Sequence, residues 1–151
     1  MSANRGVLLY DVLRQVRPLV LNSARVVEQD LAADGLTVGM RAVLEVLADN
    51  GPATVPAIGE RLDLARQGIQ RHVNDLSERG LVETRDNPAH RRSVLIGLTA
   101  AGAARFERIR RDELGRLDRM AGECTADEIA TAVKVLRSLN RDVRSRAGGD
   151  R

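Results

Sequence analysis

Residues 62–99 read LDLARQGIQRHVNDLSERGLVETRDNPAHRRSVLIGLT, and this stretch decides the fold. Its first half has apolar residues at helical spacing, which predicts a helix over residues 66–79. Gly80 follows as a C-terminal cap, because glycine readily adopts the left-handed conformation that ends a helix. Two short strands are then predicted, at 82–85 and 93–98, with a polar loop between them.

Further helices are predicted on both sides of this stretch. Apolar residues three or four positions apart predict a long first helix that ends at Asp34 and Gly35, with a kink expected at Pro18. Apart from the first helix and the helix at 66–79, each predicted helix follows a threonine that can cap it. These residues are Thr37, Thr54, Thr99 and Thr125. The predicted order is ααααββαα, a mostly α fold with one small β hairpin.

The bulk composition is that of a globular protein. The chain has 151 residues, with 43% hydrophobic and 30% charged, which predicts a single domain over 1–151. No apolar run approaches the roughly 18 residues of a membrane span, and no signal peptide is recognised. The single cysteine, Cys124, excludes an internal disulfide and suits a reducing compartment. We therefore expect a cytoplasmic protein without a membrane partner.

The charge and the aromatic content narrow the class of partner. The net charge is +3, from 24 basic and 21 acidic residues, and Lys134 is the only lysine. Arginine suits phosphates and guanine edges, although genomic base composition also explains the excess of arginine. Tyr10 and Phe106 are the only aromatic residues, and proteins that bind single strands or RNA usually stack bases on aromatic side chains. If this chain binds nucleic acid, the sequence favours a duplex.

The predicted helix at 66–79 has one apolar face and one polar face. Ile69, Val73 and Leu76 form the apolar stripe. The polar face carries side chains that read base edges in a major groove: Arg66, Gln67, Gln70, Arg71 and Asn74. A solvated helix face is also polar without any partner, so the loop that follows decides between the two interpretations.

That loop ends in a basic tip, His90-Arg91-Arg92. An arginine there can enter a narrow minor groove, where the negative potential is deepest. Two solvated loop charges are the alternative. His90 could titrate near neutral pH and add positive charge toward phosphate, or it could be a neutral loop residue. A helix followed by a basic hairpin is typical of a winged helix-turn-helix, which places the helix in the major groove and the wing beside it.

Three pieces of the chain resemble the MarR family of bacterial transcriptional regulators. They read LTVGMRAVLEVLADNGPATV, LARQGIQRHVNDLSERGLVE and RRSVLIGLTAAG, within 36–117. The resemblance implies a DNA-binding lobe at 37–99 and dimerisation helices at 6–34 and 100–146. It further implies a homodimeric regulator, expected to be a repressor, on a pseudo-palindromic operator. Family members often release DNA when they bind a small, commonly aromatic acid.

The chain departs from the family pattern at two places. The family wing usually reads Asp-x-Arg, and His90 stands where that carboxylate would brace the wing, which puts the order of the wing in question. Ala65 stands where a serine commonly caps the recognition helix, and Asp63 is the expected substitute.

An effector and other functions are less well defined by the sequence. An anionic or aromatic effector is expected among the first, second and fifth helices, near Tyr10, Arg14, Arg17, Arg41 and Phe106. No metal cluster, catalytic arrangement or phosphate loop is recognised, so neither an enzyme nor a cofactor is expected. Oxidant sensing by Cys124 is a weaker possibility. The main alternative is a winged-helix module for protein contacts, favoured by nearby acids: Asp75, Glu78, Glu83 and Asp86.

Overall fold

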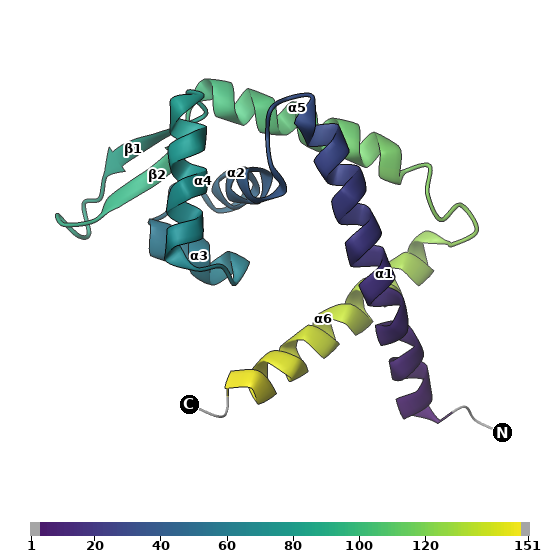
Figure 1. Ribbon diagram of the computed structural model, residues 1–151. Helices are drawn as coiled ribbons and strands as arrows, with labels where there is room; N and C mark the ends of the chain where they lie inside the picture. Colours follow the sequence, from purple (N-terminus) through teal and green to yellow (C-terminus); the bar gives the residue numbers. More distant parts are fainter. Residues whose placement is uncertain (1–3, 149–151) are drawn as a thin grey trace. The chain divides into compact units, whose positions relative to one another are not determined.

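The computed structural model describes residues 4–148, which form six helices and one two-stranded sheet (Figure 1). The elements are α1 Arg5–Ala32, α2 Val38–Asn50, α3 Val55–Leu62, α4 Arg66–Glu78, β1 Val82–Asp86, β2 Val94–Leu98, α5 Ala100–Leu117 and α6 Ala126–Gly148. The predicted order ααααββαα is confirmed. None of these helices combines the length and apolar character that a membrane crossing requires.

The threonine caps predicted from the sequence are present. At each of them the side-chain oxygen accepts a hydrogen bond from the backbone N–H three residues later, which satisfies one of the free donors at the helix start. The N···O distances are 3.2 Å at Thr37, 3.3 Å at Thr54, 3.0 Å at Thr99 and 3.2 Å at Thr125. Glu128 also accepts from the Thr125 N–H at 2.8 Å, which completes a capping box at α6.

Helix α1 runs without interruption through Pro18, although proline removes one helical hydrogen bond. It ends at Ala32, two residues before the predicted end. The chain then turns at Gly35, whose φ of 68° is in the left-handed region that favours glycine. Asp34 in this turn accepts a hydrogen bond from Arg108 at 2.7 Å, which ties the end of α1 to α5.

The described residues fall into two compact units, one up to Ile109 and one from Arg110 onward. The hydrophobic core belongs to the first unit and combines the end of α1, the turn after it, α2, α3, α4, the hairpin and the first turns of α5. Phe106, Met40 and Leu44 are among its largest fully buried side chains. In contrast, α6 has no buried residue. The core therefore holds α4 and the hairpin in one compact lobe.

Strands β1 and β2 pair antiparallel, from Val82 opposite Leu98 to Asp86 opposite Val94. A third segment joins this sheet at the middle of β2. Ala53 exchanges two backbone hydrogen bonds with Ile96, at 3.0 and 2.8 Å. This bridge links the connection between α2 and α3 to the hairpin, and no local pattern in the sequence predicts it.

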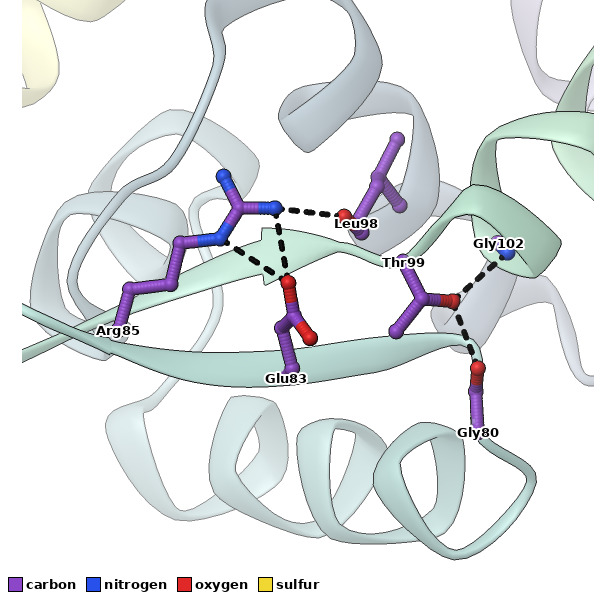
Figure 2. A network of polar contacts seen from close by, with 6 residues as sticks. All are labelled: Gly80, Glu83, Arg85, Leu98, Thr99 and Gly102. Carbon is purple, nitrogen blue, oxygen red and sulfur yellow. Dashed lines mark hydrogen bonds and ion pairs between the residues drawn. The ribbon is translucent and has the colours of Figure 1, made fainter.

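Thr99 joins the end of the hairpin to two helices, as Figure 2 shows. Its hydroxyl donates to the carbonyl of Gly80 at 2.6 Å and accepts from the N–H of Gly102 at 3.0 Å. Gly102 leaves no room for a side chain, because a Cβ there would overlap the backbone carbonyl of Leu81. The hairpin is thus fixed to the end of α4 and to the start of α5.

Candidate nucleic-acid interface

Helix α4 separates its two faces as the sequence predicted. Ile69, Val73 and Leu76 are buried in the core, with exposed fractions of 0%, 4% and 0%. The residues predicted to contact DNA lie together on the opposite, exposed face: Arg66, Gln67, Gln70, Arg71 and Asn74. We call these five residues the polar face. Their exposure makes them available to a partner, whereas their role in binding DNA stays a prediction.

The side-chain amides of Gln70 and Asn74 on the polar face are hydrogen-bonded to each other. The Nε2 of Gln70 donates to the Oδ1 of Asn74 at 2.9 Å, one helical turn away. The free oxygen of Gln70 can still accept a hydrogen bond, and the free N–H groups of Asn74 can still donate. Within residues 4–148, Arg66 and Arg71 make no ion pair, so their positive charges are not neutralised by the chain itself.

The charges of α4 are segregated along its axis. Arg66 and Arg71 lie in the first half of the helix, and Asp75 and Glu78 lie in the second. The positive end of the helix dipole adds to the arginines at the first half. An anionic partner would therefore be attracted to the start of α4.

The start of α4 differs from the expectation. Ala65 precedes the helix and no side chain caps it. The expectation that Asp63 would serve as the cap is wrong, because Asp63 instead ends α3 in a left-handed conformation with φ of 52°. The first backbone N–H groups of α4 are consequently not bonded by a capping side chain.

The other side of α4 packs closely on α2. The imidazole of His72 occupies the position where a Cβ of Gly39 would be, so a larger residue at position 39 would displace this side chain. Helix α3 is tied to the end of α2 through Arg61, which donates to the Oδ1 of Asn50 at 2.8 Å. These contacts join α4 and α3 to α2.

The loop between β1 and β2 is ordered by its own hydrogen bonds. The side chain of Asn87 accepts from the N–H of Ala89 at 3.1 Å and donates to the hydroxyl of Ser93 at 3.0 Å. The order of the wing was in question because of the missing carboxylate, and Asn87 and Ser93 supply bonds that this carboxylate would not. The Asn-Pro pair at 87–88, a turn-initiating signal, could have indicated them.

The basic tip of this loop is exposed. His90, Arg91 and Arg92 are all exposed, as the sequence predicted. No ion pair neutralises Arg91 or Arg92 among the described residues. In the ribbon the hairpin stands beside α4, so one lobe presents both a polar helix face and a basic loop (Figure 1).

The residues expected near an effector come together only in pairs. Arg41 lies over the ring of Phe106, 5.8 Å from its centroid, and its guanidinium also pairs with Glu45 at 2.9 Å. Arg14 lies over Tyr10 at 5.9 Å. For Arg17, which is exposed, the structure gives no such partner. Cys124 is exposed, and no group of potential metal ligands occurs in the described residues.

The six helices and the hairpin define a winged-helix fold of the kind that regulators use on DNA. The model of the MarR family matches residues 34–93. A crystal structure of a MarR family transcription regulator, SP03579, is 35% identical, covers 94% of both chains and superposes with a TM-score of 0.82. The chain therefore belongs to the MarR family of transcriptional regulators, which are not enzymes.

Two further proteins are similar to this chain. An uncharacterized protein of Mycobacterium tuberculosis is 40% identical over 102 residues, which is 68% of each chain. A mutant MarR of E. coli, solved in complex with operator DNA, is 23% identical and covers 91% of this chain and 99% of that one, with a TM-score of 0.71. At that identity the E. coli structure supports the fold alone.

Proposed function

We propose that this chain is a homodimeric transcriptional repressor that binds a pseudo-palindromic duplex in the cytoplasm, at the nucleoid. Helix α4 enters the major groove and the wing, residues 82–98, lies along the adjacent minor groove. The observation that carries the proposal is the exposed polar face of α4 beside an exposed basic loop in one lobe. The DNA complex of the E. coli relative is consistent with it.

The chemistry of the polar face suits base edges. Arginine forms paired hydrogen bonds with guanine, while glutamine and asparagine form them with adenine. Arg66, Gln67, Gln70 and Arg71 lie in the first two turns of α4, the part of a recognition helix that normally reaches the bases. The uncapped backbone N–H groups at this end are additional donors for a phosphate.

The proposal of a dimer rests on the exposed apolar side chains of the two terminal helices, α1 and α6. Large apolar side chains of α1 and α6 are exposed, and an isolated chain gains nothing from that exposure. Exposed fractions include 53% for Leu8, 65% for Leu19, 49% for Ile129 and 58% for Val143. A second copy can cover such faces, and two-fold symmetry would give two α4 helices for the two halves of a palindrome.

A direct test of DNA binding uses a pool of randomised duplexes. The wild-type protein should retain a palindromic sequence, with an affinity that falls steeply with salt because each neutralised phosphate contributes a slope of about −0.9. Sedimentation of the complex should give two chains per duplex. If no sequence is enriched and binding stays weak at every salt concentration, the protein-contact module becomes the better interpretation.

An effector is the last part of the proposal. A small anionic or aromatic acid would have to compete with Glu45 for the guanidinium of Arg41. Such a ligand should raise the melting temperature and weaken the DNA complex, because a ligand that prefers the DNA-free state shifts the population toward it. A panel of small aromatic acids that leaves both quantities unchanged would remove this part alone.

A further inference from the structure

The loop that carries the basic tip consists of two consecutive turns that share His90. In the first, the N–H of His90 donates to the carbonyl of Asn87 at 3.2 Å. In the second, the N–H of Ser93 donates to the carbonyl of His90 at 3.2 Å. Arg91 and Arg92 are the two central residues of the second turn, so they occupy its outer corner. No residue of the loop has a positive φ, so neither turn needs glycine.

One side chain connects the two turns. The Oδ1 of Asn87 accepts from the N–H of Ala89 inside the first turn, at 3.1 Å. The Nδ2 of Asn87 crosses the loop and donates to the hydroxyl of Ser93 at 3.0 Å, where the second turn ends. Asn87 is half-buried, whereas the three residues of the tip, 90–92, are exposed. The position of the tip is therefore fixed through the backbone of His90 and through the side chains of Asn87 and Ser93.

We propose that Asn87, with Ser93 as its partner, is a positioning residue that directs Arg91 and Arg92 toward the DNA backbone. This inference rests on the proposed DNA binding. Asn87 does not touch the DNA itself. It holds the second turn in one conformation before binding, so less conformational freedom is lost when the arginines meet phosphate. Because the side-chain amide of Asn87 is neutral, its hydrogen bonds hold the loop without adding a negative charge near the phosphates.

The test combines amide exchange with DNA affinity. Exchange of the Ala89 and Ser93 amides, measured by NMR without DNA, should be faster in Asn87→Ala than in wild type. Thr84→Ala is the matched control, because Thr84 is exposed on β1 and its hydroxyl makes no hydrogen bond in the described residues. Far-ultraviolet circular dichroism verifies that both variants are folded.

Affinity is measured for the duplex that wild type selects from the randomised pool, by fluorescence anisotropy at fixed salt. We expect Asn87→Ala to weaken binding by about 5- to 10-fold. Ser93→Ala should weaken binding too, since it removes the hydrogen bond from Asn87 and the bond that the Ser93 hydroxyl donates to the carbonyl of His90 at 3.4 Å. In a variant that already carries Arg91→Ala and Arg92→Ala, adding Asn87→Ala should change affinity by less than about 2-fold. A residue that acts through the two arginines has no effect once they are gone.

Three outcomes distinguish the failure of this inference from the failure of the proposed function. If wild type selects no duplex, the proposed function fails and the inference falls with it. If wild type selects a duplex but Asn87→Ala binds it as tightly, the inference alone is overturned. An effect of Asn87→Ala that persists in the double-arginine variant also overturns it, because Asn87 would then act by another route.

Discussion

Replacing Thr99 with valine should separate the contribution of its hydroxyl from that of its shape. The hydroxyl accepts from the N–H of Gly102 at the start of α5 and donates to the carbonyl of Gly80 at the end of α4. Valine has nearly the same volume and favours the same extended backbone, so the change removes two hydrogen bonds and little packing.

The cost follows from these two bonds. Loss of an N-cap costs about 1 kcal/mol. The bond to Gly80 adds about 0.5 kcal/mol, at the low end of the usual range because the exposed carbonyl regains water. A total of about 1.5 kcal/mol corresponds to a decrease in melting temperature of about 3–6 °C for a chain of this size.

Urea unfolding at one fixed protein concentration measures the change, since a dimer's stability depends on concentration. Thr84→Val is the control, because it makes the same substitution at an exposed position of β1. If the two variants differ by less than about 0.5 kcal/mol, Thr99 does not join the hairpin to the helices in the way the geometry indicates.

Three other predictions concern the interface, α5 and α6. Arg71→Ala should relax base preference at one operator position, whereas Arg92→Ala should weaken binding to all sequences and lower the salt slope by about 1 per contact, in anisotropy titrations with wild type as control. Gly102→Ala should destabilise the protein by about 2 kcal/mol in urea unfolding, because its Cβ would overlap the Leu81 carbonyl; unchanged or higher stability would contradict the close approach. Hydrogen bonds from the backbone N–H of Thr125 and, to a smaller extent, from its hydroxyl lower the pKa of the Glu128 carboxyl below its usual 4.5. Its carboxylate therefore stabilises α6 above that pH, and the benefit disappears as the pH falls through the lowered pKa. The stability difference between wild type and Glu128→Gln should vanish in acid, and a difference independent of pH would argue against this role.

The elements themselves were largely predictable because their signals are local. Thr37 and Thr54 cap helices through the backbone three residues away, and the apolar period of α4 is visible within four residues. The polar face was found for the same reason, since residues opposite a buried stripe must be exposed. Asp63 was misassigned because a side chain near a helix start can also belong to the end of the preceding helix, and only the backbone conformation distinguishes the two.

The order of the wing stays open at the level of the sequence for a different reason. The family pattern directs attention to one carboxylate at the tip, whereas the hydrogen bond between Asn87 and Ser93 spans the base of the loop, six residues apart. The Asn-Pro pair indicates a turn, but it does not show which distant hydroxyl the asparagine amide will meet.

By itself, then, the sequence determined the order of helices and strands, the caps and the exposed side of α4, because these depend on neighbours within one or two helical turns. Only the tertiary structure decided which distant residues meet. The bridge between Ala53 and Ile96 and the contact of Thr99 with Gly80 join segments far apart in the chain. Such contacts form because collapse of the core brings backbone groups together that must then be hydrogen-bonded, and no local pattern encodes that requirement.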